Sequence, residues 1–183
     1  DIADWRAFVD YMGVLKSCGV AESIKDLYWD VRPKPEYGTV EVRVCDTPLS
    51  IDRAVELAAF AQCLACHLLR ERPPIAPAMQ ALVARYNKFQ ACRFGFKAEL
   101  ADPIKRRKEA LGETLIRLLD SLLPDAEDLG CRRPLERLQA LVESGYGDAA
   151  WLRHTAAGAG NLHDLTRAAV ARFAEPTRYR PHS

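Results

Sequence analysis

Apolar residues recur at every third or fourth position along most of this chain, and that spacing predicts a mainly helical protein. The first helix is predicted over residues 4–16, where Trp5, Phe8, Met12 and Leu15 would share one face. The segment 51–72 is apolar on most sides and can be capped by Ser50 or Asp52, so we expect a buried helix there. Further helices are predicted over residues 78–93, 113–123, 134–144, 148–156 and 161–173.

Two short segments, 27–32 and 39–45, break the helical pattern. The first is aromatic and β-branched, and the second alternates strictly between valines and polar residues, so both are predicted to be strands. Prolines and Gly38 lie between them and favour the turn of a hairpin. Two strands alone do not make a stable sheet. The sequence therefore predicts an α+β fold whose antiparallel hairpin either joins a larger sheet or decorates a helical protein.

The second strand has two different faces, because successive side chains of a strand point to opposite sides. The valine face is expected to pack on helices, whereas Glu41 and Arg43 share the other face. A turn centred within residues 34–37 would place Asp30 opposite Glu41, Tyr28 opposite Arg43 and Arg32 opposite Thr39. Two facing carboxylates need a positive charge between them, either an arginine or a divalent cation. The alternative is a solvated strand face with ordinary ion pairs.

Composition limits the functional classes. The chain has 183 residues, of which 49% are hydrophobic and 28% charged, with a formal net charge of +1. That balance argues against a nucleic-acid or membrane-surface protein, and no apolar run is long enough for a transmembrane helix. Six cysteines in mostly apolar runs, without a secretion signal, lead us to expect reduced thiols in the cytoplasm. The chain starts without Met, so we expect it to be part of a longer protein, with a flexible tail over residues 174–183.

Three short motifs invite functional interpretations that we consider weaker than structural ones. The letters CLACH at residues 63–67 match a haem-attachment signature, but they lie in mid-helix and offer no evident fourth ligand for zinc. We expect buried thiols and a packed His67. The glycines at residues 158–160 lack the preceding strand of a dinucleotide site. The basic run at residues 105–108, within a charged loop, is expected to be solvated, with an anion clamp over ATP as the alternative.

Longer stretches carry a family resemblance. Residues 29–48 read WDVRPKPEYGTVEVRVCDTP, residues 87–95 read NKFQACRFG, and Asp102-Pro103 follow. With the helix AVELAAFAQCLA, these stretches resemble the carboxylate–amine ligases of the glutamate–cysteine ligase family, in its bacterial branch. The resemblance covers most of the chain, is dense from Tyr28 to Pro103 and becomes looser beyond Leu122.

The resemblance implies a glutamine-synthetase-like fold, of which residues 1–183 would be the C-terminal half of one catalytic domain. Such ligases use ATP and Mg²⁺ to phosphorylate a carboxylate, here that of glutamate, which an amine such as cysteine then attacks. The N-terminal half of the same enzyme would be the necessary partner. Assembly into a homo-oligomer is a further possibility, and no nucleic acid or membrane partner is implied. A rival hypothesis is a catalytically inactive helical module that completes a partner's sheet.

The same resemblance assigns candidate site residues. Glu41 would bind Mg²⁺, and Arg43 and Arg32 would be catalytic residues that contact phosphate or the substrate carboxylate. Asn87 and Arg93 would join Arg43 in binding the nucleotide, although a helix-end hydrogen bond and a surface ion pair are equally good interpretations. These residue types suit the chemistry, because Mg²⁺ prefers carboxylate oxygens and arginine binds phosphate bidentately. The metal-binding acids of the family's first strands would lie in the N-terminal half, which this sequence lacks.

Overall fold

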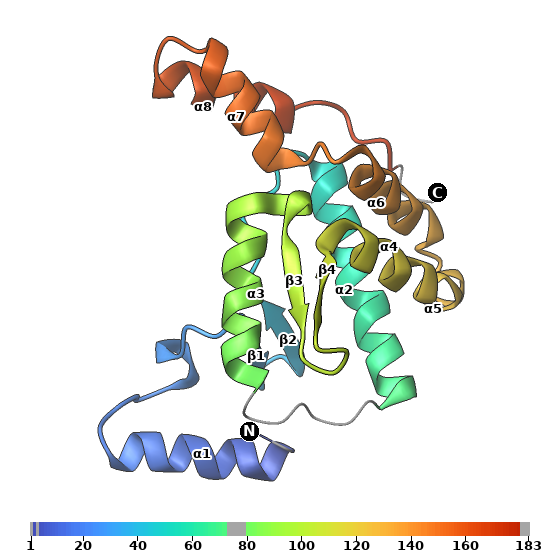
Figure 1. Ribbon diagram of the computed structural model, residues 1–183. Helices are drawn as coiled ribbons and strands as arrows, with labels where there is room; N and C mark the ends of the chain where they lie inside the picture. Colours follow the sequence, from blue (N-terminus) through green and yellow to red (C-terminus); the bar gives the residue numbers. More distant parts are fainter. Residues whose placement is uncertain (1, 3, 73–79, 180–183) are drawn as a thin grey trace. The chain divides into compact units, whose positions relative to one another are not determined.

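A computed structural model describes residues 2, 4–72 and 80–179 and shows an α+β chain, as predicted (Figure 1). The described residues are mostly helical and contain two antiparallel sheets of two strands each. The chain divides into two compact units, Asp1–Thr47 and Pro48–Ser183. None of the helices in the described part is both long and apolar enough to cross a membrane.

The first unit begins with the predicted amphipathic helix, α1 (Trp5–Ser17). Asp4 caps it by accepting a hydrogen bond from the Ala7 N–H at 2.8 Å. Phe8 and Met12 are the buried residues of its apolar face, and the Phe8 ring lies 6.3 Å from that of Trp29. The apolar face predicted from the periodicity therefore packs α1 on the aromatic segment before the hairpin. A short 3₁₀ helix, η1 (Ile24–Asp26), lies between them.

The predicted hairpin consists of β1 (Val31–Lys34) and β2 (Thr39–Val42). The predicted bounds were wrong for both strands, because β1 starts after the aromatic residues and β2 ends three residues earlier than expected. Pro33 lies inside β1, which is tolerated because both strands of a two-stranded sheet are edge strands. Gly38 completes the turn with a φ of +62°, a conformation that glycine adopts without strain.

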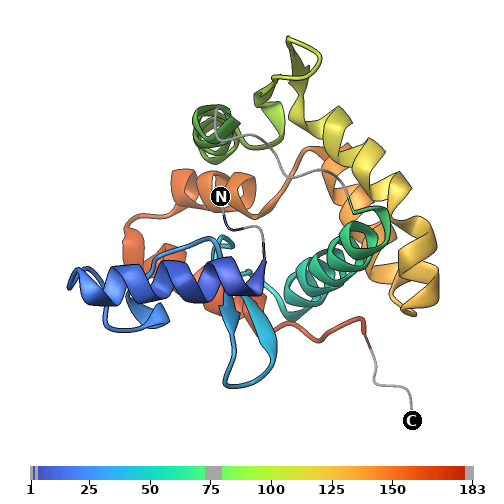
Figure 2. The ribbon, with the colours of Figure 1, turned by 90° about the horizontal axis from the view of Figure 1, so that it is seen from below.

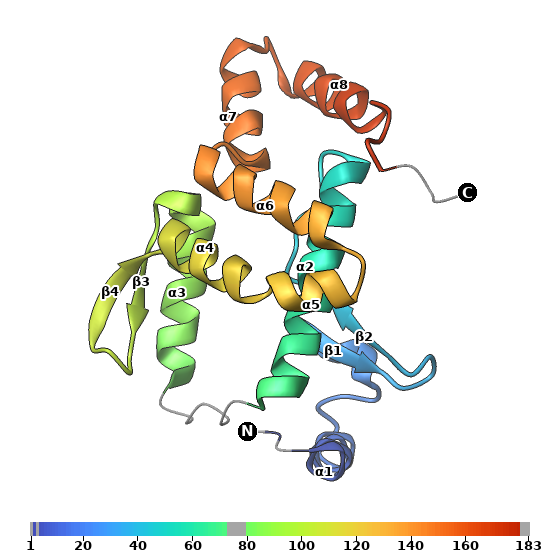
Figure 3. The ribbon, with the colours of Figure 1, turned by 90° about the vertical axis from the view of Figure 1, so that its right-hand side faces the viewer.

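The core of the second unit is formed by four helices: α2 (Ile51–Glu71), α4 (Leu111–Ser121), α5 (Leu123–Asp128) and α6 (Arg132–Ser144). Figure 3 shows α4, α5 and α6 gathered along α2. The fully buried side chains at their contacts include Cys63, Leu119, Leu122 and Leu135. Ser50 caps α2, as predicted, and its Oγ accepts the Arg53 N–H at 3.1 Å.

The expectation that α2 is buried on most sides was wrong. Only Glu56, Ala59 and Cys63 are buried along it, and Leu69 is 77% exposed. The reason is that α5 and α6 cover one face of α2. Phe60 and Leu64 pack against the core there, whereas Leu68 and Leu69 stay exposed.

Residues 99–110 form a second hairpin rather than the predicted charged loop. It follows α3 (Gln80–Phe94) and the 3₁₀ helix η2 (Gly95–Lys97), and it consists of β3 (Glu99–Asp102) and β4 (Arg107–Ala110). Figure 2 shows this hairpin, in yellow-green, projecting beside the start of α4. The tail of the unit carries α7 (Asp148–Gly158) and α8 (Leu162–Phe173), which pack on each other and agree closely with the predicted helices.

Candidate functional site

The hairpin of the first unit brings Glu41 and Arg32 together, in a register that differs from the predicted one. Arg32 pairs with Glu41 and Lys34 with Thr39, so the strands are shifted by two residues from the prediction. The prediction that Asp30 faces Glu41 was therefore wrong. A shift of two residues keeps every side chain on its predicted face, because the side-chain period of a strand is two. The carboxylate of Glu41 thus faces a guanidinium instead of a second carboxylate.

The pair of Arg32 and Glu41 is close and unequally exposed. The Arg32 Nε donates to Glu41 Oε2 at 2.5 Å, and the side chains are 8% and 35% exposed. The hydrogen bond from Arg32 is the largest effect on the pKa of Glu41 and, against the opposing effect of burial, holds this pKa below its usual range. The charges of Lys34 and Arg43 act in the same direction. Glu41 is therefore a carboxylate at neutral pH, which is the form that binds a metal ion.

Arg32 also holds the hairpin to the segment before it. Its Nη1 donates to the carbonyl oxygens of Ile24, Lys25 and Leu27 at 3.2–3.4 Å. These carbonyls lie in η1 and just after it, and that of Ile24 also accepts the Leu27 N–H at 3.2 Å. Most of the hydrogen-bonding capacity of this arginine is thus used inside the unit. Its geometry is that of a residue that positions Glu41.

Arg43 is exposed and lies just past the end of β2. Its backbone N–H donates to the Asp30 carbonyl at 2.7 Å, which continues the hairpin register by one more pair. Its guanidinium carbon lies 5.7 Å from the centre of the Tyr28 ring, and Tyr28 is 87% exposed. Stacking on an aromatic ring limits the motion of a guanidinium without using its hydrogen-bond donors. Arg43 can therefore offer its donors to an anionic group.

The valines of this hairpin do not pack on helices, contrary to the prediction. Val31, Val40 and Val42 are between 46% and 64% exposed. Antiparallel sheets bury one apolar face and solvate the other. The apolar face of this hairpin is therefore exposed in this unit.

The fit of this site to Mg²⁺ is partial. Glu41 supplies one ionised carboxylate, and Mg²⁺ is commonly held by one or two carboxylates together with water and substrate phosphates. In the part of the chain that the structure describes, His, Cys, Asp and Glu side chains do not gather in a group of three or more that could hold a metal ion. This hairpin could contribute one ligand to a magnesium site, and further ligands would have to come from elsewhere.

Asn87 and Arg93 both lie on α3, in the second unit, and each has a local partner. The Asn87 side-chain amide forms two hydrogen bonds to the backbone of Ala101, with its Nδ2 donating at 2.9 Å and its Oδ1 accepting at 2.8 Å. This pairing imitates a strand and fixes β3 to α3. Arg93 is exposed, and its guanidinium carbon lies 5.7 Å from the centre of the Phe94 ring. The structure thus shows an anchoring contact for Asn87, and a nucleotide role for either residue stays a prediction.

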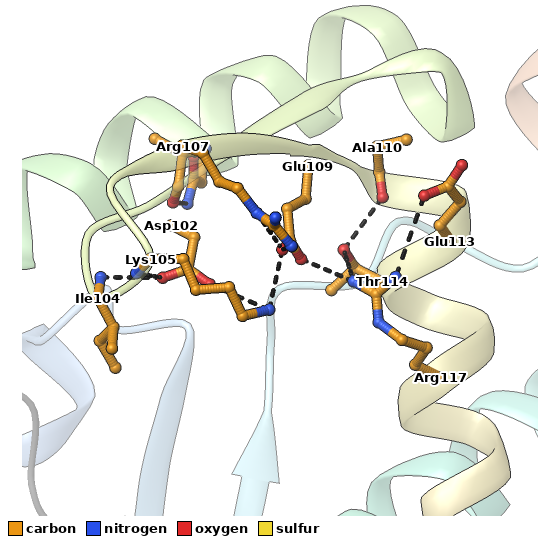
Figure 4. A network of polar contacts seen from close by, with 11 residues as sticks. Asp102, Ile104, Lys105, Arg107, Glu109, Ala110, Glu113, Thr114 and Arg117 are labelled. Atoms are coloured by element: carbon orange, nitrogen blue, oxygen red, sulfur yellow. Dashed lines mark hydrogen bonds and ion pairs between the residues drawn. The ribbon is translucent and has the colours of Figure 1, made fainter.

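Two of the four basic residues in the run 105–108, Lys105 and Arg107, pair with an acid of their own hairpin. Figure 4 shows Glu109 at the centre of a network in which Lys105 donates at 2.8 Å, Arg107 at 2.8 Å and Arg117 at 2.6 Å. Asp102 closes the turn by accepting the backbone N–H groups of Ile104 and Lys105. The run is solvated, as expected, since residues 105–108 are all exposed, but residues 107–108 belong to β4 instead of a loop.

Glu109 should titrate far below an ordinary glutamate. Hydrogen bonds from Lys105 and Arg107 lower its pKa to about 2. A lowered folded-state pKa stabilises the hairpin at neutral pH, and this stabilisation is lost as the pH falls from the ordinary value of ~4.3 toward 2. Carbon-detected NMR of the side-chain carboxyl should give that low midpoint, and Lys105→Gln should raise it. A midpoint near the ordinary value would contradict the network.

Two buried carboxylates escaped the sequence predictions. Glu56, on α2, accepts hydrogen bonds from Arg53 and from Arg137, the latter at 3.1 Å. Asp125, on α5, is fully buried and accepts from Arg70 at 2.9 Å. The one available signal was an acid in the middle of the apolar run AVELAAFAQ, since such an acid needs a partner. The identity of that partner, 81 residues away, could not be read from the sequence.

The CLACH motif lies inside the helical core. Cys63 is fully buried, with its Sγ 3.2 Å from that of Cys131, and burial is the main cause that raises its pKa to about 12. The His67 Nδ1 lies 3.1 Å from Asp125 Oδ2. The expected roles of a buried thiol and a packed histidine are confirmed for these two residues.

Comparison with known proteins identifies the family. A model described as "Glutamate-cysteine ligase family 2 (GCS2)" matches residues 1–168. A protein of Dechloromonas aromatica named "Putative glutamate--cysteine ligase 2" is 53% identical over 172 residues, which make up 94% of this chain and 45% of that protein. Proteins with the same name from Cupriavidus metallidurans and Bordetella avium are 42% and 50% identical, over 91% and 84% of this chain and 45% and 37% of their own lengths.

The chain therefore spans less than half the length of these curated relatives. The family model, in contrast, covers nearly the whole chain, including both hairpins and the helical core. The resemblance seen in the sequence is confirmed: this chain belongs to glutamate–cysteine ligase family 2.

Proposed function

We propose that this chain is the C-terminal half of an ATP-dependent carboxylate–amine ligase with a glutamine-synthetase-like fold. The observation that carries the proposal is the hairpin face on which Glu41, Arg32 and Arg43 lie together, in a chain of the glutamate–cysteine ligase family. The substrates would be glutamate and an amine such as cysteine. The products would be a γ-glutamyl amide, ADP and phosphate.

The reaction would proceed in two steps that need no protein nucleophile. An oxygen of the glutamate side-chain carboxylate attacks the γ-phosphorus of ATP, the bond to the β-phosphate oxygen breaks, and ADP leaves with that electron pair. The amine nitrogen then attacks the acyl carbon, the carbon–oxygen bond to phosphate breaks, and the nitrogen loses a proton. Both steps concentrate negative charge on phosphate oxygens, so cationic groups held in place carry most of the catalysis.

Each hairpin residue has a role in this proposal. Glu41 would be one ligand of Mg²⁺, which would neutralise charge on the phosphates. Arg43, with its guanidinium resting on Tyr28, would bind a phosphate or the substrate carboxylate. The hydrogen bonds of Arg32 favour a positioning role over the direct phosphate contact that the family pattern suggested. A nucleotide role for Asn87 is less favoured, because both ends of its amide are bound to Ala101.

The missing partner would be the N-terminal half of the same enzyme. A two-stranded sheet is too small to be stable alone, and the valine face of β1 and β2 is exposed. The relatives are more than twice as long as their matched regions. Further strands and metal ligands from that half would complete the sheet and the site.

The exposed valine face also supports a second candidate function. A catalytically inactive module would use the same hairpin to complete the sheet of a partner, and Arg32 and Glu41 would then be a structural ion pair. The deciding experiment is to measure ADP release with glutamate, Mg²⁺ and a panel of amines that includes cysteine. The complete protein should turn over, and the chain of residues 1–183 should not. A complete protein that is folded but inactive with every amine would favour the module.

Replacing Arg43 with lysine should impair the complete enzyme although the charge is kept. Lysine cannot give the bidentate geometry of a guanidinium and stacks less well on Tyr28, so we expect ATP turnover to fall by at least ~10-fold. Arg6→Lys, at an exposed position of α1, is the matched control and should leave turnover unchanged. Full activity of Arg43→Lys would show that charge alone suffices and would remove the bidentate role.

A further inference from the structure

A cavity of about 550 Å³ lies within the second unit, and its lining includes none of the hairpin residues discussed above. It is bounded by the first turn of α2, by α6, α7 and α8, and by the segment that follows α8. Four arginines line it: Arg53, Arg137, Arg172 and Arg178. Four guanidinium groups around one cavity require hydrogen-bond acceptors, because each carries five N–H donors.

The carboxylates beside this cavity are well occupied. Glu56 accepts hydrogen bonds from Arg53, from Arg137 and, at 3.4 Å, from the Tyr179 hydroxyl. Asp52 Oδ1 accepts the Thr177 hydroxyl at 2.6 Å and a backbone N–H at 2.9 Å. These hydrogen bonds outweigh the effect of burial and lower the pKa of Asp52. Asp52 is therefore ionised, and both acids already hold their own donors.

The donors on the other side of the cavity are poorly occupied. Arg172 lies with its guanidinium carbon 4.6 Å from the centre of the Trp151 ring. Among the described residues its side chain makes one long hydrogen bond, to Asp148 Oδ1 at 3.4 Å. The Arg53 Nε is 3.9 Å from the same oxygen and has no hydrogen-bond partner among the described residues. A guanidinium carries five donors. Two arginines thus converge on one carboxylate oxygen that satisfies neither of them.

The surroundings of Arg172 hold it ready to bind. Its side chain is 27% exposed, so it has lost much of its hydration while keeping an open side toward the cavity. The Trp151 ring fixes the plane of the guanidinium without using its N–H groups. The first turn of α2 also lines the cavity, and the partial positive charge of a helix N-terminus favours anions. The exposed Glu175 keeps the lining close to neutral, so the free donors, and not net charge, would select the ligand.

We propose that this cavity is an oxyanion site, in which Arg172, held against Trp151, binds the carboxylate or phosphate group of a small molecule. The incoming oxyanion takes the N–H groups that Asp148 leaves unused. The site is independent of the proposed ligase chemistry, because it uses none of the residues assigned to that reaction.

The test measures anion binding to the chain of residues 1–183. Inorganic phosphate and, separately, the dicarboxylate glutarate are titrated at constant ionic strength, and binding is followed by calorimetry and by the NMR signals of the arginine Nε–H groups. We expect saturable binding of at least one anion, with the Arg172 Nε–H and the Trp151 indole N–H shifted. Binding of phosphate alone or of glutarate alone would identify which oxyanion the site prefers.

Matched variants separate a built site from general charge attraction. Arg172→Gln should weaken binding by about tenfold or more, because a charge-assisted bidentate contact is lost. Arg172→Lys should also weaken it, since lysine keeps the charge but loses the planar fork. Arg167→Gln removes an exposed arginine of the same helix that does not line the cavity and should change nothing.

Three outcomes would overturn the proposal: no saturable binding of either anion, equal weakening by Arg167→Gln, or full affinity in Arg172→Gln. Circular dichroism checks that each variant is folded. If Arg172→Gln fails to fold, the NMR shift changes of the unmodified chain on anion addition test the site instead. Shifts at exposed arginines without shifts at Arg172 and Trp151 would contradict the site.

Discussion

Replacing Glu41 with glutamine in the complete protein is expected to lower Mg²⁺-dependent ATP turnover by about 10²–10³-fold, the cost typical of losing one preorganised charged group. Glutamine has nearly the same shape and can still accept a hydrogen bond from Arg32, so the hairpin should stay folded. The variant removes the negative charge of the Glu41 carboxylate, which the hydrogen bond from Arg32 keeps ionised at neutral pH. The measurement is ADP release at saturating glutamate and amine over a range of Mg²⁺ concentrations.

The control for this variant is Glu36→Gln, in the turn of the same hairpin. Glu36 is 42% exposed and contacts Lys34 at 3.6 Å, so its removal changes the local charge equally without touching Glu41. Undiminished turnover in Glu41→Gln would remove this residue from the site. A loss of activity in Glu36→Gln as large as in Glu41→Gln would mean that the hairpin acts only through its overall charge.

Glu56→Ala should be the most destabilising single change among those considered, with a loss of ~3 kcal/mol in the free energy of unfolding. Glu56 is 3% exposed and is the common acceptor of Arg53 and Arg137. Removing it leaves Arg53, whose side chain is only 15% exposed, without its close partner. The desolvation cost of that guanidinium is then no longer offset. Urea unfolding followed by far-ultraviolet circular dichroism measures the loss.

Glu71→Ala provides the comparison on the same helix. Glu71 is 58% exposed, and its 3.6 Å contact with Arg70 is a surface ion pair, which contributes at most ~1 kcal/mol. Glu56→Gln should fall between the two variants, because its amide can still accept one hydrogen bond. Equal stability of Glu56→Ala and Glu71→Ala would show that the buried network adds nothing to the fold.

Local rules predicted most of the helices, although the short helix α5 (Leu123–Asp128) was missed. The segment 51–72 forms α2 from Ile51 to Glu71, and the segment 161–173 forms α8 from Leu162 to Phe173. Caps, prolines and glycines act within a few residues of a helix end, so the sequence contains the information that sets these bounds. The predicted partners of the apolar faces were less accurate, because covering a face requires another element at the right place.

The strand pairing in the two hairpins could not be predicted fully from local sequence rules. The faces of β1 and β2 were predicted correctly, but their register was wrong by two residues, because the turn is centred one residue later than that register requires, between Glu36 and Tyr37. The hairpin of β3 and β4 was missed, since its charged residues have low strand propensity. Its pairing depends on contacts such as that between Asn87 and Ala101, which join residues 14 apart.

The sequence by itself determined the helical pattern, the two faces of the first hairpin and the family, because these depend on short-range periodicity and on long runs of letters. The tertiary structure alone decided the partner of Glu41, the burial of Glu56 and Asp125, and the convergence of Arg53 and Arg172 on Asp148. The last of these contacts joins α2, α7 and α8. The physical reason is that these contacts join residues far apart in the sequence. The electrostatic partner of a side chain depends on which elements pack together, and local sequence rules do not determine that packing.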